Sequence, residues 1–173
     1  MIQFSTPAIP ANPQGQDVKL TREQIWQGLL WKGEYPTLFV KPILEARIVE
    51  TYPDGFLREI LHQDDVGTEW LQERIFLEPM HTMTFLRMNG RVHGHILNII
   101  EGDDDDPTLR FAFTLAIEGE VHGGEAEQRY EQAFEKGYVI AVQATLEAVR
   151  ESVRTGSNPT LELAEARHGA ASR

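Results

Sequence analysis

The 173-residue chain contains no cysteine, and this absence excludes several kinds of site at once. Without a thiol the chain forms no disulfide bond, has no thiolate nucleophile and offers no thiolate ligand to a metal ion. Long apolar runs are missing as well, since none approaches the roughly 20 residues that a membrane-spanning helix needs. We therefore expect no integral association with a membrane.

Basic residues are also scarce in this chain. Lysine and arginine together number 16 against 27 aspartates and glutamates, which gives a formal net charge of −11. Nucleic acids and anionic membranes are bound by basic surfaces, so we expect the chain to bind neither. The first residues show no basic region followed by an apolar stretch. We therefore predict no signal peptide and a cytoplasmic location.

What is present is the composition of a globular protein, 41% hydrophobic and 25% charged, at a length that suits one domain with a sizeable core. We predict a single domain over residues 1–155. Residues 156–173 contain proline and glycine and end in small and charged side chains. This composition predicts a mobile C-terminal tail.

Start signals and apolar spacing mark two main helices. Thr21 suits an N-cap, and Gln24 stands at the third helical position of a capping box, so a helix should begin there. A shorter helix is expected at residues 35–40. A long helix is predicted over residues 125–154, because apolar side chains recur there at steps of three and four.

Between these helices the apolar period changes to two, which is typical of strands. A first strand near residues 2–9 is followed by six more at 43–52, 56–62, 68–78, 81–88, 91–101 and 108–118. Their short connections predict an antiparallel meander, and the long helix is the obvious cover for its apolar face. The sequence thus predicts an α+β fold, with a curved sheet around the C-terminal helix and a cavity for a small, mainly apolar ligand.

Four segments, in this order, resemble a known superfamily. They are Leu20–Leu29 (LTREQIWQGL), Tyr35–Val40 (YPTLFV), Asp54–Glu59 (DGFLRE) and Leu97–Glu101 (LNIIE). The chain resembles START-like and birch-pollen-allergen-like (SRPBCC) proteins over residues 1–155, and within them the AtaL-like family of unknown function. The resemblance implies a helix-grip fold, in which a seven-stranded sheet curls around the C-terminal helix. Members of the superfamily bind lipids, sterols, polyketides or plant hormones, and some are cyclases or hydrolases.

A charged row is expected to cross the otherwise apolar inner face of the sheet. A three-residue turn at Pro53–Gly55 would place Glu50 opposite Arg58, and Arg58 would lie opposite Glu73 on the next strand. These groups form a structural ion-pair cluster in one interpretation, and lie in solvent in another. In the functional interpretation, Arg58 binds a carboxylate or carbonyl of a ligand. Glu50 or Glu73 then orients Arg58 or accepts a proton.

Two histidines on one strand are a second candidate feature. Tight turns at Glu78–His81 and Asn89–Gly90 would place His93 and His95 on the same inner face, with His95 opposite Phe113. With a third ligand they would form a metal site, but two histidines alone are a weak signal. They are otherwise partly exposed side chains, or groups that form hydrogen bonds with a ligand. We expect no metal and no cofactor.

Aromatic side chains complete the predicted lining. Phe111 and Phe113 lie on the last strand and Phe134 and Tyr138 on the long helix, where core packing is the simplest role and the Tyr138 hydroxyl is a candidate ligand anchor. Trp70 is expected on the outer face, where it marks a patch for a homodimer. The predicted ligand-binding residues are Glu50, Arg58, Glu73, His93, His95, Phe111, Phe113, Phe134 and Tyr138.

Three functions are consistent with this pattern. The first is binding of a small apolar or amphipathic molecule, such as a lipid or polyketide, in the cavity. The second is an enzyme of the polyketide cyclase or aromatase type that uses cavity Arg, Glu and His side chains. The third is an interaction module whose core is filled by its own side chains.

Overall fold

The structure is a computed structural model, and it describes residues 1–64 and 66–158. The predicted tail therefore lies outside the described residues from residue 159 onward. The elements are β1 (Ile2–Ser5), β2 (Ile9–Pro10), α1 (Arg22–Glu34), the 3-10 turn η1 (Pro36–Leu38), β3 (Ile43–Tyr52), β4 (Gly55–Asp64), β5 (Gly67–Glu78), β6 (Thr82–Arg87), β7 (Val92–Asp103), β8 (Asp106–Ile117) and α2 (Glu125–Thr155).

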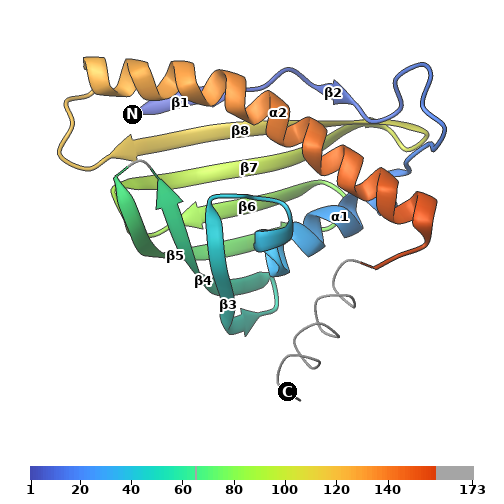
Figure 1. The fold of residues 1–173 in the computed structure, drawn as a ribbon, viewed down its shortest axis with the longest axis horizontal. Coiled ribbons are helices and arrows are strands. Elements are labelled where there is room, and N and C mark those ends of the chain that lie inside the picture. Colours follow the sequence, from blue (N-terminus) through green and yellow to red (C-terminus); the bar gives the residue numbers. More distant parts are fainter. Residues whose placement is uncertain (65, 159–173) are drawn as a thin grey trace.

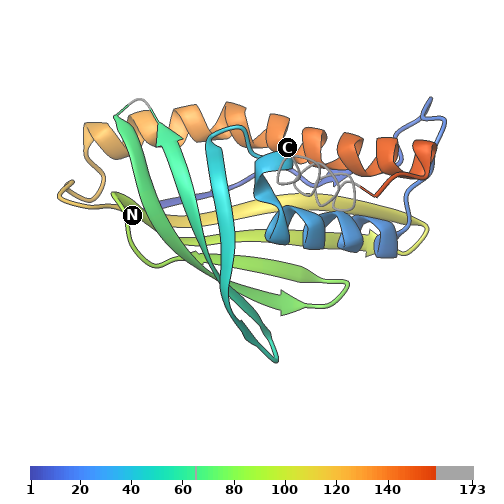
Figure 2. The same cartoon turned by 60° about the horizontal axis from the view of Figure 1, so that its bottom comes forward.

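All strands belong to one antiparallel sheet in the order β1-β8-β7-β6-β5-β4-β3, with the two-residue β2 pairing with β8 as an eighth strand. Figure 1 shows α2 lying across this sheet. In Figure 2, β3, β4 and β5 rise steeply from the remaining strands, so the sheet curls and both helices lie on its concave side. The predicted α+β helix-grip architecture is confirmed.

Helix α1 begins as the sequence predicts and packs closely on α2. Thr21 is the N-cap, and its side chain accepts from the backbone N–H of Gln24 while the Gln24 side chain accepts from that of Thr21. A Cβ atom on Gly28 would come within 2.1 Å of Val149 Cγ2 on α2. The glycine therefore allows the two helices to approach at this point.

The two halves of α2 are held in different ways. The C-terminal half buries Val142, Leu146 and Val149 in the core that it shares with α1. The N-terminal half contributes only partly buried rings, of which Phe134 and Tyr138 contact Phe113 on β8. This half of the helix therefore rests on the β1–β8 side of the sheet.

The pairing of β4 with β5 is as predicted, whereas that of β3 is not. Arg58 lies opposite Glu73. Tyr52 pairs with Gly55, and a β-bulge between Ile48 and Glu50 places Ile48 opposite Arg58. The predicted three-residue turn is wrong: the loop has two residues, so Glu50 pairs with Leu57 on the outer face, where it accepts a hydrogen bond of 2.7 Å from the Tyr52 hydroxyl. The bulge then returns Ile48 to the inner face.

The connection between β5 and β6 is one residue longer than the predicted turn. Glu78 pairs with Thr82, so the loop has three residues, and Met80 in it adopts a φ of 67°. The extra residue reverses the faces of β6 relative to the prediction. The inner residues of β6 are therefore Met83, Phe85 and Arg87 instead of Thr84 and Leu86.

The same reversal continues into β7 and ends at β8. The predicted two-residue turn at Asn89–Gly90 is wrong, because Arg87 pairs with Gly94 across a wider loop. His95 pairs with Thr114 instead of Phe113, so His93 and His95 lie on the outer face. A second one-residue offset thus cancels the first, and Phe111, Phe113 and Leu115 face inward as predicted. The inward residues of β7 are Val92, Gly94, Ile96, Asn98 and Ile100.

Candidate functional site

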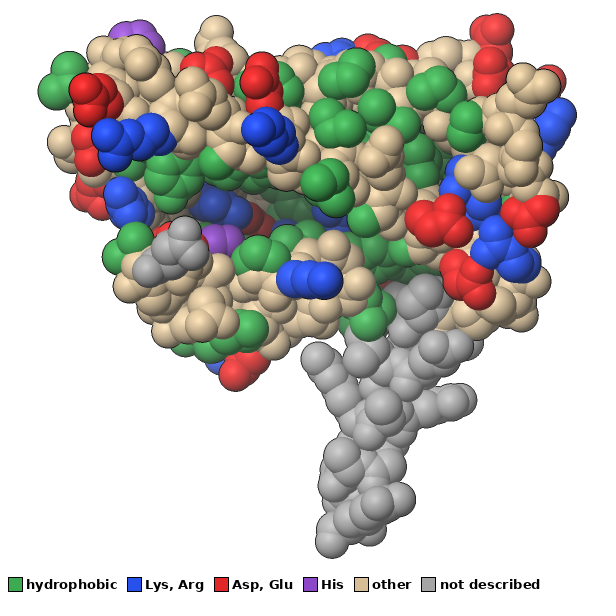
Figure 3. Space-filling model, turned by 45° about the horizontal axis from the view of Figure 1, so that its top comes forward, with side chains coloured by type: hydrophobic (Ala, Val, Ile, Leu, Met, Phe, Trp, Pro, Cys, Tyr) green, Lys and Arg blue, Asp and Glu red, His purple; other side chains and the backbone are tan. Residues whose placement is uncertain are grey.

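An open cleft lies between α2 and the inner face of the sheet. Figure 3 shows the surface hollowed below α2, with basic, acidic and histidine side chains inside the hollow. Ile48 lies opposite Arg58 on the inner face and is nevertheless 45% exposed, which agrees with an unfilled space next to β3.

Three charged side chains lie next to one another on the inner face of the sheet, on β4, β5 and β6. Glu73 is 2% exposed, and its Oε2 accepts from Arg58 Nε at 2.9 Å and from Arg58 Nη2 at 2.6 Å. Its Oε1 accepts from Arg87 Nε at 3.2 Å. Burial alone would raise the pKa of Glu73, but the two arginines lower it, so the carboxylate is charged. We call Arg58, Glu73 and Arg87 the charged floor.

All three guanidinium nitrogens of Arg58 already form hydrogen bonds with the protein. Its Nη1 donates to the backbone carbonyls of Lys32 and Gly33, near the end of α1, and its side chain is 4% exposed. Terminal carbonyls of a helix lack partners within the helix, so Arg58 caps α1 and joins it to the sheet. This geometry favours the structural interpretation of Arg58.

Arg87 differs from Arg58 in this respect. Its side chain is 13% exposed, and Nε donates to Glu73. Within the described part of the chain, its Nη1 and Nη2 atoms form no hydrogen bond. Arg87 therefore offers two guanidinium nitrogens to a ligand in the cleft.

Lys32 lies next to the charged floor, at the end of α1. Its Nζ donates to Asn98 Oδ1 at 2.8 Å and lies 3.9 Å from the centre of the Phe111 ring. Burial lowers the pKa of Lys32 to about 7, and the charge of Arg58 acts in the same direction while that of Glu73 opposes it. The amine is therefore divided between its charged and neutral forms near neutral pH.

Asn98 is fully buried and only partly satisfied. Its Oδ1 accepts from Lys32, whereas its Nδ2 forms no hydrogen bond within the described residues. A buried amide donor without a partner is costly, and Asn98 has no exposed surface through which a ligand in the cleft could reach it.

A histidine and a tyrosine lie within electrostatic range of Arg87. His62 is half-buried, and burial, together with the charge of Arg87, lowers its pKa, so the imidazole is neutral at pH 7. Burial raises the pKa of Tyr138 to about 12, and the charges of Arg87 and Glu73 both act on it. The Tyr138 hydroxyl forms no hydrogen bond with another described residue.

The predicted site residues thus separate into two groups. The structure brings Arg58, Glu73, Phe111, Phe113, Phe134 and Tyr138 to the inner side, where Phe113 and Tyr138 have ring centres 3.8 Å apart. It places Glu50, His93 and His95 on the outer face, because of the shorter turn before β4 and the longer loop before β6.

Sequence reasoning missed Lys32, Arg87 and Asn98. Arg87 and Asn98 lie on β6 and β7, and the predicted turns exchange the inner and outer faces of these two strands. The predicted register therefore turns both side chains toward solvent. The motif LNIIE contains Asn98, and a polar residue in an apolar run was the signal that could have identified it. Lys32 gave no such signal, since a lysine near a helix end is common on a surface.

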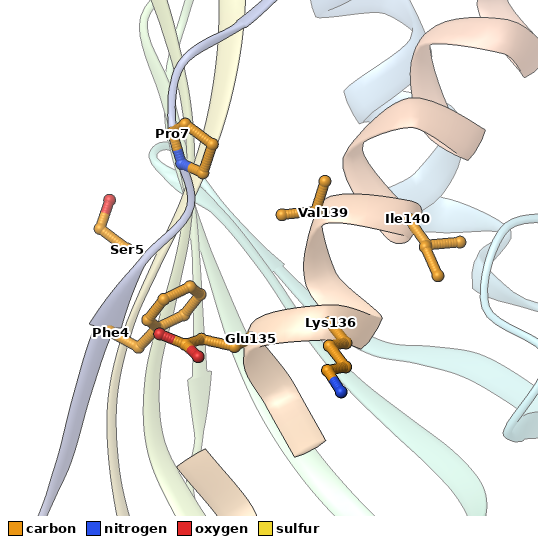
Figure 4. Close-up of a pocket in the computed structure, with 7 residues that line it drawn as sticks. All are labelled: Phe4, Ser5, Pro7, Glu135, Lys136, Val139 and Ile140. Atoms are coloured by element: carbon orange, nitrogen blue, oxygen red, sulfur yellow. The ribbon is translucent and has the colours of Figure 1, made fainter. Parts of the chain in front are cut away.

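Outside the cleft, a shallow groove of about 640 Å³ runs between β1 and α2. Figure 4 shows Phe4 and Pro7 of the N-terminal segment across the groove from Val139 of the helix. On the outer face of the sheet, Trp70 is 46% exposed, and the Arg47 guanidinium lies 5.4 Å from the centre of its ring.

Two further findings concern only the described residues. No group of three His, Asp or Glu side chains among them is arranged to hold a metal ion. None of their helices is long and apolar enough to cross a membrane.

Comparison with known proteins gives one family match. Residues 6–156 match the family described as acetylaranotin biosynthesis cluster protein L. No curated protein sequence matches the chain.

Several solved structures share the fold. An aromatase/cyclase from Streptomyces sp. R1128 is 16% identical with a TM-score of 0.63, over 91% of this chain and 97% of that one. A START superfamily protein from Mycobacterium smegmatis is 12% identical with a TM-score of 0.63, over 87% and 98%. The structure titled Ara h 8.0201 is 12% identical with a TM-score of 0.54, over 86% and 94%. At these identities the likeness shows a common fold.

Proposed function

Because the chain belongs to the family of acetylaranotin biosynthesis cluster protein L, we propose that it binds a small, mainly apolar ligand in the cleft between α2 and the sheet. The observation that carries this proposal is the cleft itself, which is open below α2 and has aromatic rings from α2 and β8 next to it. Partly buried rings are a favourable surface for an apolar body, because their burial by a ligand removes further apolar area from water.

The solved structures support the same proposal. An aromatase/cyclase and a START superfamily protein share the fold over most of their length. A lipid or a polyketide-like molecule is therefore the ligand class that we favour.

The proposal is tested by filling the cleft. Binding of dodecanoate and of naphthalene-2-carboxylate is measured by titration calorimetry and native mass spectrometry. We expect Ile48→Trp to abolish binding, because Ile48 is on the inner face and half exposed, so a larger ring there occupies the cleft. The control is Val139→Trp, because Val139 points into the groove between β1 and α2 (Figure 4).

The two variants separate the two hollows. Loss of binding in Val139→Trp but not in Ile48→Trp would place the ligand in the groove and contradict the proposal. If no apolar ligand binds the wild-type protein, an interaction module with a filled core becomes the better description.

A second candidate function is catalysis on a polyketide-like substrate. It is favoured by Lys32, whose pKa of about 7 suits transfer of a proton near neutral pH, and by the fold shared with an aromatase/cyclase. Lys32→Met should then reduce turnover of a poly-β-ketone substrate by about 100-fold, the size typical of a lost general base. Unchanged turnover in this variant would exclude Lys32 from the reaction.

A further inference from the structure

The charged floor contains more hydrogen-bond donors than acceptors. Both carboxylate oxygens of Glu73 are already used, one by Arg58 and one by Arg87. Nη1 and Nη2 of Arg87 have no hydrogen-bond partner among the described residues. A ligand that forms hydrogen bonds with these nitrogens must therefore supply oxygen acceptors.

The net charge of the charged floor also indicates a ligand with oxygen acceptors. Arg58 and Arg87 carry two positive charges against the single negative charge of Glu73, although the chain as a whole has a formal net charge of −11. The remaining positive charge lies on side chains that are at least 87% buried, where it is poorly compensated by water. A ligand with one negative charge would neutralise it.

We propose that the ligand carries a carboxylate, which Arg87 binds through its two free guanidinium nitrogens while the apolar body of the ligand packs on the rings of α2 and β8. This inference rests on the proposed function and specifies its ligand class. The planar fork of an arginine matches the two oxygens of a carboxylate, which a hydroxyl or a single carbonyl does not.

The Tyr138 hydroxyl supplies a third contact. It has no protein hydrogen-bond partner, its ring lies against Phe113, and Arg87 acts on it electrostatically. A tyrosine that is apolar over its ring and polar at its tip suits the junction between the apolar body and the acid group of the ligand. Arg87 therefore provides the charge, and Tyr138 donates a hydrogen bond beside it.

The experiment compares each acid with its neutral amide. Affinities of the wild-type protein are measured for dodecanoate against dodecanamide, and for naphthalene-2-carboxylate against naphthalene-2-carboxamide. We expect each acid to bind at least about tenfold more tightly than its amide, because hydrogen bonds between charged groups are stronger than hydrogen bonds to neutral groups. Arg87→Gln should abolish this preference, and Tyr138→Phe should reduce it.

A matched control is Arg47→Gln. It removes the same charge from the outer face of the sheet, where Arg47 is mostly exposed and pairs with Glu59. The preference for acids should persist in this variant. If Arg87→Gln does not fold, Arg87→Lys keeps the charge and loses the fork, and the preference should fall severalfold.

The outcomes separate this inference from the proposed function. Equal binding of acid and amide to the wild-type protein would overturn the carboxylate and leave the apolar cleft intact. A preference for acids that survives in both Arg87 variants would overturn the assignment to Arg87. Failure of acids and amides alike to bind would instead reject the proposed function.

Discussion

Arg58 on β4 and Arg87 on β6 both pair with the carboxylate of Glu73 on β5, yet they have different roles. All three guanidinium nitrogens of Arg58 form hydrogen bonds with Glu73 or with the end of α1, so its contribution is to the folded structure. Arg87 uses one of its three guanidinium nitrogens to bind Glu73, and the other two can form hydrogen bonds with a ligand. The number of unused nitrogens distinguishes Arg87, the proposed binding residue, from Arg58. Residue type does not distinguish them, because both are arginines with largely buried side chains.

Replacing Glu73 with glutamine should therefore be strongly destabilising. It leaves two largely buried guanidinium groups without a counter-ion, and we expect the free energy of unfolding to fall by about 3–5 kcal/mol. The measurement is urea denaturation. Glu59→Gln is the control, since Glu59 pairs with the exposed Arg47 and its loss should cost under about 1 kcal/mol. Similar losses in the two variants would contradict the role given to Glu73.

Lys32 should make stability depend on pH in the alkaline range. Its pKa is about 7 in the folded protein and near the ordinary 10.5 when unfolded, so the unfolded chain binds more protons between these values. Stability should accordingly rise as the pH increases from about 7 to about 10. Below pH 7 both states are protonated, and the cost of the buried charge is fully present.

The test compares the wild-type protein with Lys32→Met across this range. The free energy of unfolding of the wild type should increase relative to the variant as the pH rises from 7 to 10. Lys41→Met, at an exposed position, should show no such divergence. Parallel pH profiles for the wild type and Lys32→Met would show that the amine is not buried as described.

At the scale of elements, the sequence predicts what depends on local signals. The capping box of α1 and the pairing of Arg58 with Glu73 follow from residue types and spacing, and both are found in the structure. The faces of β6 and β7 depend instead on the length of the loop at residues 79–81. There a methionine adopts a left-handed conformation that its residue type does not predict. The candidate site could be only half predicted for this reason.

The loop itself should respond to a glycine. Met80 has a φ of 67°, which is unfavourable for a side chain with a Cβ atom, and its side chain is partly buried against the core. Met80→Gly and Met80→Ala both remove this packing, but only glycine relieves the backbone strain, so the glycine variant should be more stable by about 0.5–1 kcal/mol. Thermal denaturation of the two variants is the measurement. At His81 the order should be reversed, because glycine there adds only freedom to the unfolded chain. A Met80→Gly variant that is no more stable than Met80→Ala would count against the left-handed conformation.

At the scale of the whole molecule, the main core between the sheet and the helices is closed at one end and open at the other. The closed end is where Val142, Leu146 and Val149 of α2 meet α1, and the open end is the cleft below the N-terminal half of α2. Local stability should follow this division, since regions with little buried apolar surface open more easily.

Hydrogen exchange should detect the difference along α2. Amides of residues 128–138 should exchange faster than those of residues 142–152, and saturating dodecanoate should slow the first group more than the second. In Ile48→Trp, where the cleft is filled, dodecanoate should have no effect. Uniform exchange along the helix would show that its two halves are equally stable.

The three-residue connection between β5 and β6 also has a consequence for relatives of this chain. A homologue that lacked one residue there, with the same strand sequences, would turn Thr84 and Leu86 toward the helix and Arg87 toward solvent. Because β7 pairs with β6, His93 and His95 would turn inward as well, and imidazoles would replace the Arg87 guanidinium on the inner face. A single insertion or deletion in one hairpin therefore changes the ligand preference without any substitution inside the cleft, and alignments of the family should be examined for it.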